Sequence, residues 1–274
     1  MPLIHFKNLK KGFKKPHRII PSLLYRFNNK EENIRQKICN KNIIWHFCTP
    51  KSASSYLVYL MMNLDINTIV SMPHYGNRPH VNDFSDLLEK IKTYPFNNFF
   101  YISHQHTLFD DYLERFISKK HKVIIQTRNI YESILSLQDM LILKKKNRNN
   151  PWVQFSKKYS KEEFLKLLIY NYVPFHCNFI KSWVENEIKG EKIFVNYKDY
   201  VKNEKKYLKK ILFGNKKNII IPKLKTIDKK TIKFHIGLKR KNTLSAVNKK
   251  LIDDIVNINT KYSYPKVKSL IYQN

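Results

Sequence analysis

The sequence predicts an α/β domain in which a central parallel β-sheet is covered by helices on both faces, giving three layers. Segments rich in β-branched and aromatic residues alternate with segments whose apolar residues recur at helical spacing. The chain has 274 residues, 42% of them hydrophobic, which is enough for one sizeable core. Linker signals are few, so we expect a basic extension over residues 1–40 and a single globular domain over 41–274.

Each element follows from its local pattern. Strands are expected where apolar runs are rich in β-branched residues, at 42–48, 98–102, 121–127 and 192–197. Helices are expected where apolar residues recur every three or four positions, at about 54–63, 108–116, 131–137, 161–189 and 203–213. Polar stretches rich in Pro, His, Asn or Lys predict loops at 71–80 and 144–150, and the tail from 224 is basic without a clear pattern.

The formal net charge of +31 favours an anionic partner such as nucleic acid, an anionic membrane or an acidic substrate. Lysine is spread over the whole chain, however, as an AT-rich codon bias would also produce. The extension over 1–40 interleaves lysines with apolar residues such as Leu3 and Phe6. It could contact an anionic membrane as a peripheral segment, or pack its apolar residues on the main domain. Charge alone therefore selects no partner.

The compartment and redox state follow from absences in the sequence. No apolar run is long enough to cross a bilayer, and the first residues lack the features of a signal peptide, so we expect a cytoplasmic protein. Three widely spaced cysteines, Cys39, Cys48 and Cys177, have neither a disulfide pattern nor the spacing of metal ligands. We expect free, mostly buried thiols and no metal.

The first motif, Thr49-Pro50-Lys51-Ser52-Ala53-Ser54-Ser55, lies between a predicted strand and a predicted helix. Free N–H groups at a helix N-terminus, with a lysine and several hydroxyls, suit a phosphate or sulfate. The glycines that a nucleoside triphosphatase loop needs before its lysine are absent, which disfavours a P-loop kinase. The alternative is an ordinary capped helix with a surface lysine.

The second motif is a strand that ends in Arg128-Asn129, with Ser136 eight residues after the arginine. Together the two motifs resemble the P-K-S-G-T-T loop and the strand-R-N-x7-S pattern of the sulfotransferases that use 3′-phosphoadenosine 5′-phosphosulfate (PAPS) as donor. The segments 179–183 and 193–200 are similar to the family's helix tryptophan and its Y-E-D-L strand end. The resemblance covers about residues 42–214 and implies the P-loop NTPase-like architecture of that family.

The resemblance also implies a reaction and its residues. The chain would transfer a sulfuryl group from PAPS to a hydroxyl or amine, leaving 3′-phosphoadenosine 5′-phosphate (PAP), with no metal required. Pro50, Lys51, Ser52, Ala53, Ser54 and Ser55 would hold the 5′-phosphosulfate, Arg128 and Ser136 the 3′-phosphate, and Tyr197 and Arg240 would complete the donor site. Ala53 stands where the family has glycine, which implies a loop conformation that alanine tolerates.

The family's base is a histidine that directly follows a strand, which His104 fits best, since the strand is expected to end at residue 102. His106 is the alternative. An unperturbed pKa near 6.5 keeps much of a histidine neutral at physiological pH, so either could accept the acceptor's proton. With Lys51 at the leaving phosphate, these are the candidate catalytic residues.

The acceptor stays open among small molecules, glycans, lipids and peptide tyrosines, and the oligomeric state is open as well. Trp45 and Trp183 are expected in the core. The rival function is a non-enzymatic basic protein that binds nucleic acid or an anionic membrane, with nucleic acid the less favoured partner. Its affinity would fall steeply with salt and would not depend on Lys51 or Arg128.

Overall fold

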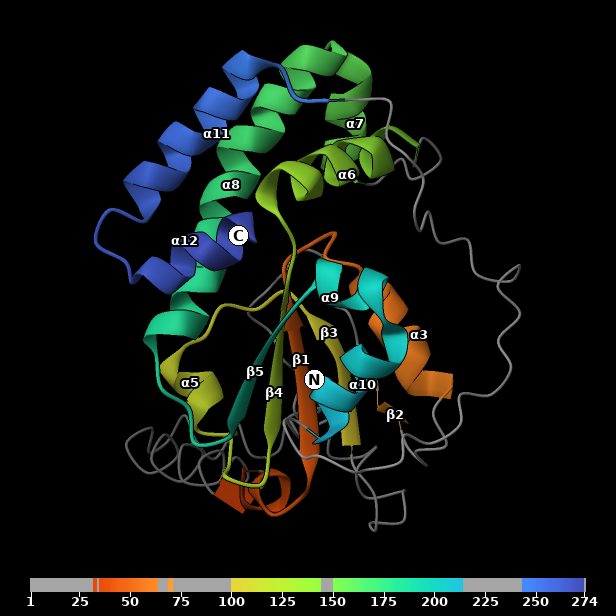
Figure 1. The fold of residues 1–274 in the computed structure, drawn as a ribbon, viewed down its shortest axis with the longest axis vertical. Helices are drawn as coiled ribbons and strands as arrows, with labels where there is room; N and C mark the ends of the chain where they lie inside the picture. Colours follow the sequence, from red (N-terminus) through yellow and green to blue (C-terminus); the bar gives the residue numbers. More distant parts are fainter. Residues whose placement is uncertain are drawn as a thin grey trace, which may run out of the picture.

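The computed structural model describes residues 32–33, 35–63, 69–70, 100–143, 150–213 and 243–273 (Figure 1). The expected loop at 71–80, most of the loop at 144–150, most of the N-terminal extension and Arg240 lie outside the described residues. From the expected extension, residues 35–39 are helical, and the Ile38 side chain is fully buried in the core.

A five-stranded sheet forms the centre of the domain, in the order β2-β3-β1-β4-β5. Its strands are β1 (Ile43–Cys48), β2 (Ile69–Val70), β3 (Phe100–Gln105), β4 (Lys122–Thr127) and β5 (Glu191–Asn196). Every neighbouring pair is parallel, so the carboxyl ends of all the strands meet at one edge. The predicted α/β class with a parallel sheet is confirmed.

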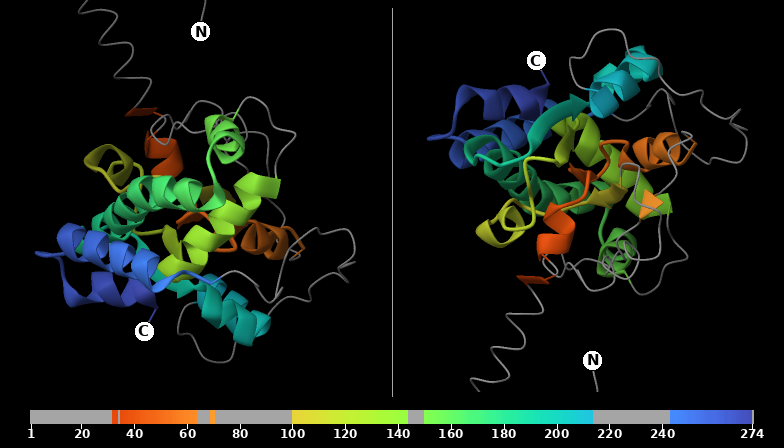
Figure 2. Two further views of the ribbon diagram at one scale, coloured as in Figure 1. Left: turned by 90° about the horizontal axis from the view of Figure 1, so that it is seen from above. Right: turned by 90° about the horizontal axis from the view of Figure 1, so that it is seen from below.

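Helices cover both faces of this sheet (Figures 1 and 2). Ile43, Trp45 and Phe47 of β1 face the core under α6 (Ile130–Leu143) and α8 (Lys161–Glu185). Ile44 faces the opposite core, under α3 (Ser54–Asn63) and α10 (Glu204–Phe213). This alternation is the period of a strand buried on both faces. α11 (Ala246–Asn259) and α12 (Pro265–Tyr272) pack outside α8 as a further pair.

Several element boundaries differ from the expectation. β3 runs to Gln105, not to residue 102, because its backbone stays paired with β1 through Phe47 and Gln105 even where its side chains turn polar. The helix expected over 108–116 is only the short α5 (Asp111–Glu114), and α8 ends at Glu185. The sequence did not predict β2, α11, α12, α7 (Pro151–Lys158) or α9 (Tyr197–Lys202).

The aromatic core supports the segment that follows β3. Trp183 of α8 is fully buried, as expected, with its ring centroid 4.4 Å from that of Phe47. Its Nε1 donates to the Thr107 carbonyl at 3.1 Å, which ties α8 to the chain just after β3. Trp45 is also buried in the core, where its Nε1 donates to Nδ1 of His121 at 3.0 Å.

The cysteines are free, with Cys48 and Cys177 buried and Cys39 half-buried. Among the described residues, no helix combines the length and the apolar character needed to cross a membrane.

Replacing Trp183 by Phe should lower the free energy of unfolding by about 1–3 kcal/mol, because it removes a buried hydrogen bond and leaves a small cavity. Urea unfolding measures this change in the free energy of unfolding, provided that the m-value is the same in both proteins. Trp152→Phe is the control, since Trp152 is only partly buried and its ring nitrogen makes no hydrogen bond within the described residues. Equal losses in both variants would contradict this role of Trp183.

Candidate functional site

The loop between β1 and α3 has an unusual backbone. Lys51 has a φ of 64° and Ala53 a φ of 67°, whereas Ser52 between them has no positive φ. Alternation of this kind makes a concave turn whose N–H groups converge on an anion. We expected a conformation that alanine tolerates; the structure instead places Ala53 in the left-handed region, where glycine has the advantage.

Neighbouring side chains fix the direction of the loop carbonyls. Three consecutive carbonyls accept hydrogen bonds: Pro50 O from Tyr172 Oη at 2.7 Å, Lys51 O from Arg128 Nη1 at 3.3 Å and Ser52 O from Gln126 Nε2 at 2.6 Å. Within the described residues, the N–H groups of Ala53, Ser54 and Ser55 have no acceptor. The loop therefore directs these three carbonyl oxygens toward the protein interior and leaves backbone N–H groups that can donate hydrogen bonds to a ligand.

The loop hydroxyls are placed unequally. The Ser52 side chain is fully buried, and its hydroxyl has no hydrogen-bond partner in the described structure. Ser54 begins α3 and is largely buried, whereas Ser55 is exposed. The hydroxyl best placed to reach a ligand from solvent is therefore that of Ser55. Ala53 can offer its backbone N–H, whereas the Ser52 N–H is bonded to the Thr49 carbonyl and the Ser52 carbonyl to Gln126.

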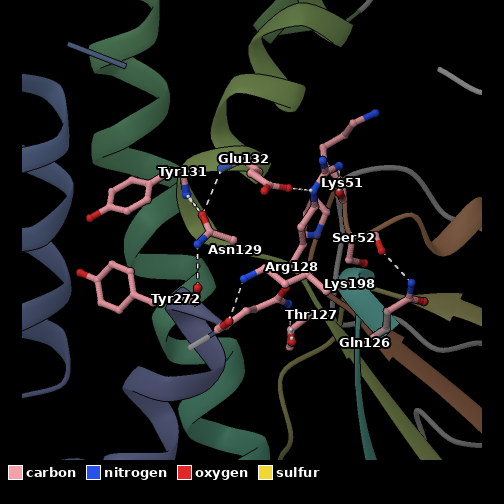
Figure 3. A network of polar contacts seen from close by, with 12 residues as sticks. Lys51, Ser52, Gln126, Thr127, Arg128, Asn129, Tyr131, Glu132, Lys198 and Tyr272 are labelled. Atoms are coloured by element: carbon pink, nitrogen blue, oxygen red, sulfur yellow. Dashed lines mark hydrogen bonds and ion pairs between the residues drawn. The ribbon is translucent and has the colours of Figure 1, made fainter. Parts of the chain in front are cut away.

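Arg128 follows β4 beside this loop, as Figure 3 shows. Its side chain is only 14% exposed, and its Nε donates to Oε2 of Glu132 at 2.9 Å. The guanidinium carbon lies 4.1 Å from the ring centroid of Tyr197, the first residue of α9, which follows β5. Arg128 also donates to the Lys51 carbonyl. Together these contacts hold its guanidinium between the ends of β1, β4 and β5.

The end of α12 braces the same strand ends, a contact that the sequence did not suggest. Asn129 caps α6 by accepting from the Tyr131 N–H at 3.0 Å, and its Nδ2 donates to the Tyr272 carbonyl at 2.7 Å. Gln273 donates to Thr127 Oγ1 at 3.3 Å. Chain segments more than 140 residues apart in sequence thereby fix the start of α6, just after Arg128.

Two further residues that the sequence assigned to PAPS binding are Ser136 and Tyr197. Ser136 is half-buried on α6, one helical turn after Glu132 and on the same face, but makes no hydrogen bond to Arg128 in the described structure. Tyr197 contacts Arg128 directly.

The two candidate histidines differ in position. His104 lies inside β3 rather than after it, and its side chain is outside the described part of the structure. His106 directly follows the strand, and its Nδ1 lies 2.7 Å from the Cys48 carbonyl at the end of β1. His106 therefore lies next to the start of the loop between β1 and α3.

The hydrogen bond of His106 determines its chemistry. A carbonyl can only accept, so Nδ1 carries the proton and the lone pair of the neutral ring is on Nε2. Burial lowers the pKa of His106 from its ordinary value, and the bond to the Cys48 carbonyl partly opposes that shift. The neutral imidazole therefore dominates at physiological pH, which suits a proton acceptor.

Among the described residues, no group of three or more His, Cys, Asp or Glu side chains is placed to hold a metal ion.

Replacing Ala53 by Gly tests the strained loop backbone. Ala246→Gly is the matched control, because Ala246 is exposed and begins α11 without a positive φ. Both substitutions raise the conformational entropy of the unfolded chain by a similar amount. The difference between their free energies of unfolding therefore reports the strain at Ala53 in the folded state. Ala53→Gly should be more stable than Ala246→Gly by about 1–2 kcal/mol in urea unfolding. Equal stabilities would show that Ala53 is not strained.

Comparisons with known proteins support the fold. No family model matches the sequence, and no curated protein matches it. The structure is similar to the crystal structure of mouse sulfotransferase SULT7A1 complexed with PAP. The TM-score is 0.55 at 17% sequence identity, covering 86% of this chain and 92% of that one. The chain therefore has the α/β fold of a sulfotransferase.

Proposed function

We propose that this protein is a sulfotransferase that uses PAPS as donor and a hydroxyl or amine as acceptor. The observation that carries the proposal is a pair of adjacent anion-binding features on neighbouring strands. The loop after β1 offers the N–H groups of Ala53, Ser54 and Ser55, and Arg128 after β4 donates to the carbonyl of that same loop. A donor with two separate phosphate groups needs two such features side by side.

The residues present fit that donor. The inward carbonyls and outward N–H groups of the loop suit the 5′-phosphosulfate, with Lys51 as the added positive charge. Arg128, whose planar fork can bind phosphate through two donors, suits the 3′-phosphate, with Ser136 and Tyr197 beside it. When bound, PAPS would supply a sulfuryl group attached to a phosphate leaving group. The loop amides and Lys51 would stabilise negative charge at that phosphate.

His106 is the better-supported base, and His104 stays the alternative. The lone pair on His106 Nε2 would take the proton of an acceptor hydroxyl, and the Cys48 carbonyl would hold the ring in that tautomer. Because burial lowers its pKa, His106 would be ready to accept a proton at neutral pH.

We propose a small-molecule, glycan or lipid acceptor. The net charge of +31 favours one that is acidic or lies at an anionic surface. The same charge favours the rival function, a non-enzymatic basic binder. The two differ in their dependence on Arg128, because a diffuse electrostatic surface does not depend on one cation that is 14% exposed.

Replacing Arg128 by Ala should remove the preference for PAP over adenosine 5′-phosphate, which lacks the 3′-phosphate. Isothermal titration of both nucleotides at one ionic strength gives that preference for each variant. We expect wild type to favour PAP by roughly 10–100-fold, since a paired Arg–phosphate contact contributes about 1.5–3 kcal/mol, and Arg128→Ala to bind both alike.

Arg115→Ala is the charge-matched control, because Arg115 is exposed and follows α5, on the segment that leads to the start of β4. Its preference for PAP should equal that of wild type. A wild type that binds the two nucleotides equally, with affinity that falls steeply in salt, would favour the basic binder instead.

The protonation of His106 can be measured without an acceptor. An NMR titration of the imidazole signals, assigned with His106→Gln, should give a midpoint below about 6.5 and the Nδ1–H tautomer. With an acceptor in hand, kcat/KM should rise with pH through that midpoint and then level off, because protonation removes the lone pair. A midpoint above 6.5 would contradict the effect of burial on the pKa of His106, and the Nε2–H tautomer would move the base to His104.

A further inference from the structure

We propose that Gln126 positions the donor loop, and that His46 and Tyr101 orient Gln126. This role rests on the proposed function and adds to it residues that bind neither donor nor acceptor. All three side chains are buried and lie on adjacent strands, Tyr101 on β3, His46 on β1 and Gln126 on β4.

The hydrogen bonds assign a donor and an acceptor to each contact among these three side chains. Gln126 Nε2 donates to the Ser52 carbonyl at 2.6 Å, so Gln126 Oε1 must be the acceptor in its contact with His46 Nε2 at 2.7 Å. His46 Nε2 therefore carries a proton, and Nδ1 of the neutral ring accepts from Tyr101 Oη at 2.6 Å. Burial raises the pKa of Tyr101 well above its ordinary value, which keeps the phenol a donor.

Gln126 holds both ends of the tight turn in the loop. Its backbone carbonyl accepts from the Thr49 N–H at 3.1 Å, and its side chain holds the Ser52 carbonyl (Figure 3). The Ser52 N–H closes the turn onto the Thr49 carbonyl at 3.3 Å. A single residue thus fixes where the turn begins and ends.

The orientation of one peptide unit links this contact to the donor. In a trans peptide, the carbonyl of Ser52 and the N–H of Ala53 point in opposite directions, and the described residues contain no cis bond. Because Gln126 draws the carbonyl inward, the Ala53 N–H faces outward, toward the proposed 5′-phosphosulfate. A carbonyl released from Gln126 could rotate toward that anion and repel it.

Gln126→Glu breaks this contact with little change of shape, because an ionised carboxylate cannot donate to the Ser52 carbonyl. Its charge would also repel PAP directly, so a loss of affinity supports the positioning role only where Tyr101→Phe, which adds no charge, shows it too. Gln138→Glu is the matched control. Gln138 is equally buried, and its Nε2 donates to the Lys161 carbonyl at 2.7 Å, on α6 rather than at the loop. Tyr101→Phe is a gentler second variant, which removes only the hydroxyl at the far end of the chain.

Two measurements are made on all three variants: PAP affinity by isothermal titration, and amide hydrogen exchange of segment 49–57 without nucleotide. We expect Gln126→Glu to bind PAP at least about tenfold more weakly and to exchange faster in that segment. Tyr101→Phe should change both in the same direction but less. Gln138→Glu should match wild type within about twofold in both, despite a similar loss of stability.

The possible failures are distinguishable. If wild type binds PAP and neither Gln126→Glu nor Tyr101→Phe alters affinity or exchange, the positioning role is wrong and the proposed function stands. If wild type does not bind PAP but Gln126→Glu speeds exchange of the loop alone, the proposed donor is wrong and the hold on the loop stands. Equal effects in Gln126→Glu and Gln138→Glu would reduce Gln126 to an ordinary core residue.

Discussion

The direction of the peptide groups in the loop after β1 is the constraint on which the candidate site depends. Three side chains from α8, the end of β4 and β4 itself hold three consecutive carbonyls inward. The sheet makes this arrangement possible, because its parallel strands end at one edge and bring these donors to the loop. Strain at Lys51 and Ala53 is the consequence, since both have positive φ without being glycine.

The site also shows how a cation can be held in place before any ligand binds. Arg128 is shared between the Lys51 carbonyl, the Glu132 carboxylate and the Tyr197 ring. These contacts orient its guanidinium, which reduces the entropy lost when a phosphate binds. Glu132 is 46% exposed, so solvent weakens its ion pair and a doubly charged phosphate could compete for the same arginine.

Much of the fold could be predicted, because strand and helix periodicity are local signals. Lys51, His106 and Arg128 follow strands whose ends lie at one edge of the sheet, whereas His104, expected just after its strand, lies inside β3. The end of β3 was misplaced because Ser103 to Gln105 are polar, whereas the pairing of the strand depends on its backbone. Contacts between Asn129 and Tyr272 join positions 143 residues apart, and no local pattern reveals them. The sequence does contain local signals of two other contacts at the site: Glu132 lies four residues after Arg128, and Gln126 is a polar residue in an apolar strand.

A crystal structure with PAP bound would test the central claim most directly. We expect the 5′-phosphate on the N–H groups of Ala53, Ser54 and Ser55, the 3′-phosphate on Arg128, and the Ser52 carbonyl still bonded to Gln126. A nucleotide bound elsewhere, or a loop whose carbonyls turn toward the phosphate, would contradict this account.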